Sequence, residues 1–418
     1  MGKRILLVGY NYSPELTGIG KYSGEMMEWL AKEGYECHVL TTYPYYPQWK
    51  VQEPYRSKRF WYSTEGHFKG RVKVYRCPMY VPAEPTGKKR MLSDLSFFVA
   101  ALFQLVTLIF TKNFDYVISV APSFQLGLLG NVYKVFRKSK HIYHIQDLQI
   151  EVAQELEMIK SEKILNLLYK VEQYIFKKTD VISTISERMV EKVEEKAKKE
   201  VVLFPNWVDN TVFYPLTEQQ KIKIDYGYRP SDKVILYSGA IGEKQGLEAI
   251  LEVAEHLLSN REIHFIICGT GPYKTKLETM SKERQLTNVK FLPLQPKDKF
   301  NAFLNMADLH LVIQKSKASD LLLPSKLTAI LAVGGLALVT ADEGSSLHTV
   351  VHKFNMGILV ETENQKALEA GILKAMSPEI GLELKENARA YSEKFLSIDT
   401  IMRSFKYGVL PFTNAGYK

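Results

Sequence analysis

Short apolar segments alternate with helical patterns along the whole chain, and this alternation constrains the fold more than any other feature. The segments are RILLVG, HVLTT, YVISVA, HIYHIQ and VISTIS in the first half, and VILYSG, HFIICGTG, VKFLP, LHLVIQ, LALVTA and GILVE in the second. Strands that alternate with helices form parallel sheets through right-handed crossovers. The sequence therefore predicts an α/β protein built from doubly wound parallel sheets.

The alternation breaks once, at FPNWVDNTVFYPL, a stretch between Pro205 and Pro215 that fits no helix. A chain of 418 residues is long enough for two domains. We expect one Rossmann-like domain over residues 1–205 and another over residues 206–390, and a last helix over residues 391–418 that belongs to neither by position. Ligands of such sheets bind beyond the carboxyl ends of the strands, so the expected site lies in a cleft between the two domains.

Charge and cysteine content narrow the classes of partner and cofactor. The formal net charge of +9 indicates an anionic partner, such as a nucleotide diphosphate, a membrane surface or nucleic acid. Basic clusters such as KKR at Lys88 are short and lack interleaved aromatic residues, which disfavours nucleic acid. Three widely spaced cysteines suit a reducing cytoplasm, and the first apolar run, Ile5 to Gly9, is too short for a signal peptide. Without a D-x-D motif or a His/Cys cluster, we expect no metal cofactor.

The segment LSDLSFFVAALFQLVTLIF, Leu92 to Phe110, is nearly long enough to span a bilayer. Asp94 and Gln104 interrupt its apolar character, and strand-like segments lie on both sides. Three interpretations stay open: a buried helix of an α/β domain, an interfacial helix whose preceding KKR sequence meets anionic lipid, and a transmembrane helix.

Two glycine-containing turns follow predicted strands. The first, GYNYSPELTGIGKYSGE, places Gly18 and Gly20 just before a helix, where phosphate groups bind. It contains neither a G-x-G-x-x-G nor a Walker A sequence, and an ordinary turn with a helix cap also explains it. The second turn, SGAIGEKQG, adds Lys244, whose ammonium group beside backbone amides suits a diphosphate.

A second lysine follows another strand of the same predicted sheet. After LHLVIQ, the sequence LPSKLTAILAVGG places Pro324 and Ser325 at a helix start and Lys326 in the first turn. The helix dipole disfavours a cation there unless an anion is bound. Lys244 and Lys326 would then lie at the carboxyl ends of two strands and together bind a nucleotide diphosphate.

In the first domain, HIYHIQDLQIE ends a predicted strand with three polar residues. His144 and Gln146 are two positions apart and share one face of the strand, and Asp147 follows it. A core histidine is the ordinary interpretation of His144. The chain shows no Ser/His/Asp triad spacing.

These features together resemble the retaining glycosyltransferases of family 4, which have the GT-B fold. The resemblance runs along nearly the whole chain and rests on PELTGIGKY, STIS, FPNWVD, GEKQGLE, CGTGP and LPSKLTAILAVGG. It is strongest to the members that build colanic acid, capsules and O antigens. It implies two Rossmann-like domains that face a cleft, an N-terminal acceptor domain, a C-terminal nucleotide-sugar domain, and a C-terminal helix that crosses back to the first domain.

The resemblance also implies roles for individual residues. It makes catalytic residues of Asp147, Lys244 and His144. It implies donor contacts from Gly18, Gly20, Gly239, Lys244, Gly269, Asp320, Pro324, Ser325, Lys326 and Leu327. It implies acceptor contacts from Glu15, Thr17, Tyr46 and Trp49. The chain departs from the family pattern at Ala240, Gln146 and Ala329, which leaves the donor base and the exact sugar contacts open.

The activity implied is that of a hexosyltransferase without a metal cofactor. The donor would be a nucleotide diphosphate sugar carrying fucose or a related deoxy or N-acetyl sugar. The acceptor would be a polyprenyl-diphosphate-linked saccharide, and the enzyme would lie in the cytoplasm, peripherally on an anionic membrane surface, without binding nucleic acid. Two alternatives stay open: a nucleotide-sugar 2-epimerase of the same fold, and a non-catalytic nucleotide-binding partner.

Overall fold

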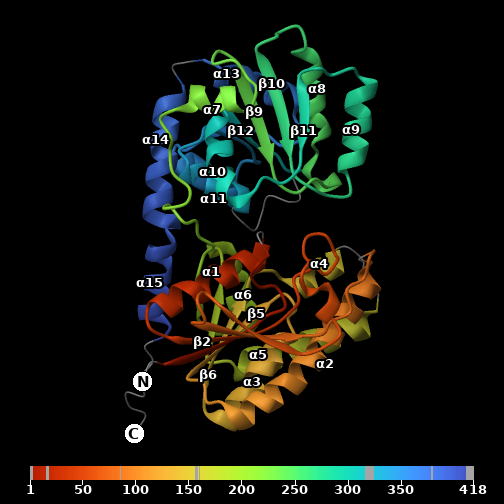
Figure 1. The fold of residues 1–418 in the computed structure, drawn as a ribbon, viewed down its shortest axis with the longest axis vertical. Helices are drawn as coiled ribbons and strands as arrows, with labels where there is room; N and C mark the ends of the chain where they lie inside the picture. The colour runs from red at the N-terminus through yellow and green to blue at the C-terminus, as the bar shows by residue number, and fades with distance from the viewer. Residues whose placement is uncertain are drawn as a thin grey trace. The chain divides into compact units, whose positions relative to one another are not determined.

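The computed structural model describes residues 3–15, 18–84, 86–155, 159, 161–315, 324–377 and 380–410, except the side chains of Val152, Glu155 and Lys244. These residues form two compact units, which are visible in Figure 1. The first unit contains Met1–Pro205 and the chain from Met402 onward, and the second contains Asn206–Ile401. We describe each unit separately.

The first unit is built on an eight-stranded sheet with the order β3-β4-β2-β1-β5-β6-β7-β8. All neighbouring strands are parallel except β3 and β4, which are antiparallel. The strands are β1 (Arg4–Val8), β2 (Glu36–Thr42), β3 (Ser63–His67), β4 (Val72–Cys77), β5 (Tyr116–Ala121), β6 (Lys140–Ile145), β7 (Val181–Thr184) and β8 (Val201–Leu203). The direction of winding reverses between β1 and β5, and the loops there are where such sheets bind ligands.

Helices cover both faces of this sheet (Figure 1). They are α1 (Gly18–Lys32), η1 (Tyr55–Lys58), α2 (Gly87–Thr111), α3 (Leu126–Arg137), α4 (Gln149–Glu155), α5 (Glu162–Lys178) and α6 (Glu187–Ala197). α2 and α3 share a core with β1, β2, β4 and β5. The last helix, α15 (Ile398–Gly408), begins in the second unit and ends in the first, where Phe405 stacks on Phe204 with ring centroids 4.1 Å apart.

The second unit is built on a six-stranded parallel sheet with the order β11-β10-β9-β12-β13-β14. The strands are β9 (Lys233–Ser238), β10 (Ile263–Cys268), β11 (Val289–Leu292), β12 (Leu309–Val312), β13 (Ala337–Thr340) and β14 (Ile358–Val360). Here the winding reverses between β9 and β12, so the loops after these two strands lie where ligands of doubly wound sheets bind.

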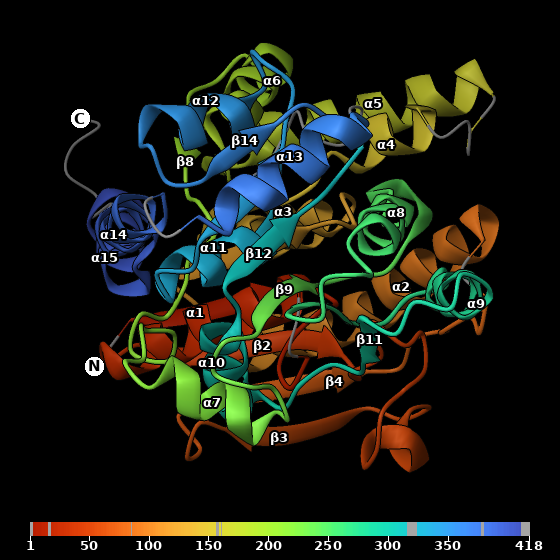
Figure 2. The ribbon, with the colours of Figure 1, turned by 90° about the horizontal axis from the view of Figure 1, so that it is seen from above.

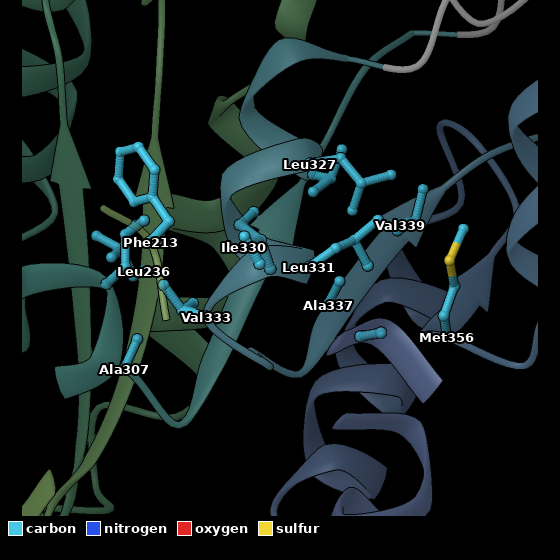
Figure 3. Close-up of a cluster of buried hydrophobic side chains, with 14 of the residues drawn as sticks. Phe213, Leu236, Ala307, Leu327, Ile330, Leu331, Val333, Ala337, Val339 and Met356 are labelled. Carbon is cyan, nitrogen blue, oxygen red and sulfur yellow. The ribbon is translucent and has the colours of Figure 1, made fainter. Parts of the chain in front are cut away.

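The helices of the second unit form two layers (Figure 2). They are α7 (Gln219–Asp225), η2 (Glu243–Gln245), α8 (Glu248–His256), α9 (Lys274–Glu283), α10 (Lys297–Met306), α11 (Ser325–Ala332), α12 (Ser346–Lys353), α13 (Gln365–Ala375) and α14 (Gly381–Tyr391). α8, α9 and α13 contribute to the core on one face of the sheet. α7, α10, α11, α12 and α14 contribute to the core on the other face. Figure 3 shows how Leu327, Ile330 and Leu331 of α11 point into that second core.

The two parallel sheets predicted from the alternation are confirmed, but the expected single C-terminal helix is not continuous. α14 is followed by a π-helical turn, Ser392–Leu396, and then by α15. The interruption has a local cause. The amide of Val208 donates to the Leu396 carbonyl at 2.8 Å, and the Ile398 amide donates to the Val208 carbonyl at 3.1 Å. These bonds to a separate segment replace the helical ones.

Candidate functional site

In the second unit, the turns after β9 and β10 pack backbone against backbone. The Gly239 amide donates to the Cys268 carbonyl at 3.0 Å, and the Ile241 amide donates to the Thr270 carbonyl at 3.0 Å. A Cβ atom placed at Gly269 would overlap the carbonyl oxygen of Gly239. Gly269 therefore allows the close approach that holds the β9 turn in place.

Lys326 lies in the first turn of α11 and faces this glycine turn. Its Nζ donates to Tyr237 Oη at 3.0 Å and lies 4.1 Å from the centroid of the Tyr237 ring. Tyr237 Oη in turn donates to the Ala240 carbonyl at 2.6 Å. A Cβ atom at Gly239 would lie 3.3 Å from Lys326 Cε, so the ammonium group lies beside the turn that follows β9.

Burial changes the proton affinity of both side chains in this contact. It lowers the pKa of Lys326 to about 7 and raises the pKa of Tyr237 well above its ordinary value. Tyr237 therefore stays neutral at physiological pH, and its contacts with Lys326 are a hydrogen bond and a cation–π interaction. A bound anion would favour the charged form of Lys326, so the site gains a full positive charge when it has something to neutralise.

A third lysine, Lys315, was not identified from the sequence. It lies just after β12, and its aliphatic stem lies across the turn that ends η2. A Cβ atom at Gly246 would be 3.4 Å from both Cγ and Cε of Lys315. The sequence did contain a signal for this residue, because QKSK places two lysines directly after β12, one of the two strands between which the winding reverses.

The remaining predicted donor residues of this unit fall into three groups. Pro324 caps α11, and Ser325 is exposed at its first position. Leu327 is fully buried in the core, and its amide already donates to the Pro324 carbonyl at 2.8 Å. These contacts do not support the predicted contact of Leu327 with the nucleotide sugar. The backbone of Lys244 lies in η2, whereas its side chain and the whole of Asp320 lie outside the described residues.

In the first unit, Glu15 fastens the loop after β1 to the aromatic loop after β2. Its Oε2 accepts a hydrogen bond from Asn11 Nδ2 at 2.8 Å. Its Oε1 accepts from the amides of Tyr45 and Tyr46, both at 3.0 Å. The carboxylate is buried, and a Cβ atom at Gly20 would lie 2.6 Å from Oε2. Glu15 and Gly20, predicted as ligand contacts, therefore have a structural role that is visible here.

Arg76, which was not predicted from the sequence, also holds the same two loops together. Its side chain is fully buried, and it donates to the Ser13 carbonyl at 2.7 Å and the Thr42 carbonyl at 2.9 Å. It also pairs with Glu65 at 2.6 Å. Burial opposes ionisation of Glu65, but hydrogen bonds from His67 and Arg76 and the charge of Arg76 lower its pKa to about 2.

The other predicted acceptor contacts lie on the aromatic loop and beside it. Tyr46 is half-exposed, and a Cβ atom at Gly18 would lie 3.8 Å from its ring. Trp49 is half-buried, packs edge-on against Tyr45 at 5.4 Å, and lies under the guanidinium group of Arg90 at 5.1 Å. Thr17 lies outside the described residues. Of this set, Tyr46 is the side chain that is open to a ligand.

Of the two catalytic residues predicted in the first unit, His144 lies within β6 and is buried, whereas Asp147 lies two residues past its end and is exposed. His144 is buried; its Nδ1 lies 3.1 Å from Ser183 Oγ, and its ring packs edge-on against Phe204. Burial lowers the pKa of His144 to about 3, so the ring is neutral and is a hydrogen-bonding group rather than a proton carrier. Asp147 is exposed directly after the strand, at the edge where ligands bind.

A second carboxylate, Asp94 of α2, lies near this edge and was not singled out as a site residue. Gln149 Nε2 donates to Asp94 Oδ2 at 2.8 Å, and Gln149 Oε1 accepts from the Phe124 amide at 2.9 Å. Burial raises the pKa of Asp94 to about 6. The described residues contain no group of three or more His, Cys, Asp or Glu side chains suited to a metal ion.

One face of α2 is buried and the opposite face is apolar and exposed. Phe97, Ala101 and Leu105 pack into the core of the first unit. The exposed face presents Met91, Leu92, Leu95, Val99, Phe103, Val106 and Phe110. We call these seven residues the α2 surface. Tyr62, which follows the exposed Phe60 and Trp61 in the sequence, donates to the Ala100 carbonyl of α2 at 3.1 Å.

Among the described helices, α2 is the one long and apolar enough to cross a membrane by length and composition. Its most apolar window has a mean hydropathy of 1.9, and 39% of that window is buried. Core helices of soluble proteins can be equally long and apolar. Because one face of α2 is part of the sheet core, lipid cannot surround this helix without disrupting the first unit.

Two family models match the chain. The glycosyl transferase 4-like domain matches residues 17–207, and the glycosyl transferases group 1 model matches residues 218–395. WcaI of Escherichia coli (strain K12), assigned as a colanic acid biosynthesis glycosyl transferase, is 40% identical over 412 residues, which cover 96% of this chain and 98% of WcaI. WbjE of Pseudomonas aeruginosa, assigned as a glycosyltransferase, is 21% identical over 65% of this chain and 69% of its own.

Solved structures with low sequence identity share the fold. Sucrose-phosphate synthase from Thermosynechococcus elongatus superposes with a TM-score of 0.72 at 15% identity, over 97% of this chain and 98% of that one. WaaG, a glycosyltransferase involved in lipopolysaccharide biosynthesis, gives 0.67 at 14% identity, over 96% and 99%. HepE of Anabaena in complex with UDP-glucose gives 0.67 at 11% identity, over 97% and 99%.

Proposed function

The chain is a glycosyltransferase of family 4 with the GT-B fold, and we propose that it transfers a sugar from a nucleotide diphosphate to a lipid-linked saccharide with retention of anomeric configuration. The assignment of WcaI to colanic acid biosynthesis supports a role in making a bacterial surface polysaccharide. The UDP-glucose complex of HepE supports a nucleotide sugar as the donor class. Fucose or a related deoxy or N-acetyl sugar is the proposed cargo.

The observation that carries this proposal is the position of Lys326 beside the glycine turn after β9. When the bond from the anomeric carbon to the donor breaks, negative charge grows on the β-phosphate. A desolvated ammonium group stabilises that charge more strongly than a solvated one. Lys244 and Lys315, which follow the two strands of the switch point, would add positive charge, so the reaction as proposed needs no metal ion.

The acceptor hydroxyl would attack the face that the diphosphate leaves, which retains the anomeric configuration. This route needs no protein nucleophile. Asp147 is the proposed positioning residue for the sugars, because it is exposed at the carboxyl edge of the first sheet. His144 contributes, at most, a neutral hydrogen-bonding ring, because its buried site disfavours protonation.

The α2 surface supports a lipid-linked acceptor. Exposed apolar side chains on one helix, preceded by Lys88, Lys89 and Arg90, suit the boundary between lipid headgroups and acyl chains. Phe60 and Trp61 are exposed aromatic residues next to Tyr62, which contacts α2, and aromatic rings favour that boundary. We therefore propose peripheral binding to the inner face of the cell membrane.

A transfer assay tests the proposed function. The purified enzyme would be incubated with GDP-, UDP- and ADP-sugars and a polyprenyl-diphosphate saccharide, with and without EDTA. We expect a glycolipid product from one donor, with the anomeric configuration of that donor retained, and no loss of activity in EDTA. An epimerised nucleotide sugar without glycolipid would instead identify an epimerase. Loss of activity in EDTA that magnesium restores would contradict the metal-free mechanism.

A further inference from the structure

The second unit contains a cavity of about 480 Å³ at the end of α11 that is opposite to Lys326. Val333, Gly334 and Gly335, which follow α11, form one wall. His310 of β12 and two basic residues of α14, Lys385 and Arg389, line other parts of it. The volume is in the range of small-molecule sites, roughly 300–1,000 Å³. Every lining residue belongs to the second unit.

His310 brings an unsatisfied acceptor to this cavity. The side chain is 1% exposed, and its Nε2 has no hydrogen-bond partner among the described residues. The Leu304 carbonyl hydrogen-bonds the ring, and because a carbonyl only accepts, the proton of the neutral ring is on the nitrogen that faces it. Nε2 is then an acceptor that requires an O–H or N–H donor. A Cβ atom at Gly335 would lie 2.8 Å from Nε2, so no side chain larger than that of glycine fits between this nitrogen and the cavity wall on that side.

Lys385 brings a cation without a counterion. Burial lowers its pKa, and the charge of Asp308 acts in the opposite direction. The Asp308 carboxylate is already engaged by Lys223 at 2.7 Å and by the Val234 amide at 2.7 Å. The described residues give the ammonium group of Lys385 neither an ion pair nor a hydrogen bond, so it can accept an anionic partner.

The other charged groups at the cavity are neutralised or lie on its exposed rim. Arg389 pairs with Glu393 at 2.7 Å and donates to the Phe213 carbonyl at 3.0 Å and to the Ala332 carbonyl. Glu386 is exposed to solvent. Lys385 is therefore the charge available inside the cavity, and His310 is the available acceptor.

We propose that this cavity is a second ligand site, distinct from the donor site, that binds a small hydroxylated anion such as a sugar phosphate or a sugar acid. Lys385 contacts the anionic group, and His310 Nε2 accepts a hydrogen bond from a hydroxyl group. The site also communicates with the donor site through α11. Arg389 binds the carbonyl of Ala332 at the last position of α11, and Lys326 occupies the second position of the same helix. α11 is about 12 Å long and packed along its length, so movement at one end displaces the other (Figure 3).

Calorimetry on the full-length protein tests the proposal with four probes: glucose 6-phosphate, glucuronate, inorganic phosphate and glucose. We expect saturable binding at millimolar concentrations for one of the first two, and weaker binding of phosphate or glucose alone. The comparison of glucose 6-phosphate with glucuronate identifies the anionic group. Absence of binding by both hydroxylated anions overturns the proposal.

Three variants locate the bound probe. Lys385→Gln should weaken binding by at least about tenfold, whereas Lys374→Gln, an exposed lysine of α13, should not. Lys326→Ala should leave binding of the probe intact, and its loss there would place the probe in the donor site and contradict the proposal. Imidazole ¹⁵N NMR provides a readout that needs no variant. The His310 Nε2 resonance should shift on saturation, and an unchanged resonance would count against the assigned contact.

Discussion

The proposed role of Lys326 depends on the residues around it, because they shield its ammonium group from solvent. The Tyr237 ring and the β9 turn cover its ammonium group, and burial lowers its pKa to about 7 from an ordinary value of 10.5. Between these two pH values the unfolded chain holds more protons than the folded one, so the stability of the folded state rises with pH over that interval. An anion at this position reverses the balance, because it favours the charged lysine.

Donor binding should therefore weaken as the pH rises above about 7, approaching tenfold per pH unit, because the enzyme must take up a proton to bind. The probe is the nucleotide sugar that the transfer assay identifies, since its phosphates do not titrate in this range. Lys326→Arg keeps a permanent charge, and its affinity should change little with pH. A flat profile for the wild-type enzyme, or the same slope in Lys326→Arg, would contradict the assignment.

Gly20 and Glu15 form a contact that tolerates no added side chain. Gly20→Ala places a methyl group 2.6 Å from the Glu15 carboxylate, and we expect a loss of about 1–3 kcal/mol in the free energy of unfolding. In a Glu15→Gly background the same substitution should cost much less, because both contacting atoms of Glu15, Oε2 at 2.6 Å and Cβ at 2.7 Å, are gone. Urea denaturation measures both, with Gly408→Ala as the control, since nothing lies within 4 Å of that position. Equal costs in both backgrounds would refute the contact.

At the scale of single elements, the sequence predicted where the strands lie better than it predicted which groups surround each side chain. Buried parallel strands are nearly continuous apolar runs, so the strands of both sheets were recognisable. The antiparallel pairing of β3 with β4 was not, because the edge strand STEGH is polar, and VKVYRC carries Lys73 and Arg76 and is not a continuous apolar run. Strand alternation placed His144 and Gln146 on one face, but it is Phe204, itself stacked on Phe405 of α15, that covers the ring of His144.

The missed site residues have a common cause. Arg76 donates hydrogen bonds to the carbonyls of Ser13 and Thr42. Because every residue has a backbone carbonyl, such partners cannot be identified from the sequence. Asp94 depends on Gln149, which is 55 positions away. Lys315 depends on the close approach of the Gly246 turn. Long-range contacts of this kind follow from the fold, not from local spacing.

α2 is the element whose two faces differ most, and its exposed face makes a separate prediction. Replacing Phe103 and Phe110 with serine should reduce flotation with vesicles that contain anionic lipid, because it removes exposed apolar area without touching the core. The matched control is Leu382→Ser, an equally exposed apolar residue of the second unit. Unchanged flotation of the double variant, or equal loss in the control, would rule out the α2 surface as the membrane contact.

At the scale of the whole molecule, the account assigns the diphosphate of the donor to Lys326 and the turns of the second unit. The most direct test compares nucleoside diphosphate with the corresponding nucleoside in calorimetry, for wild-type enzyme, Lys326→Ala and the exposed control Lys366→Ala. We predict that Lys326→Ala loses about 3 kcal/mol of affinity for the diphosphate, roughly a hundredfold, and none for the nucleoside. Equal diphosphate affinity in Lys326→Ala and wild type would contradict the central claim.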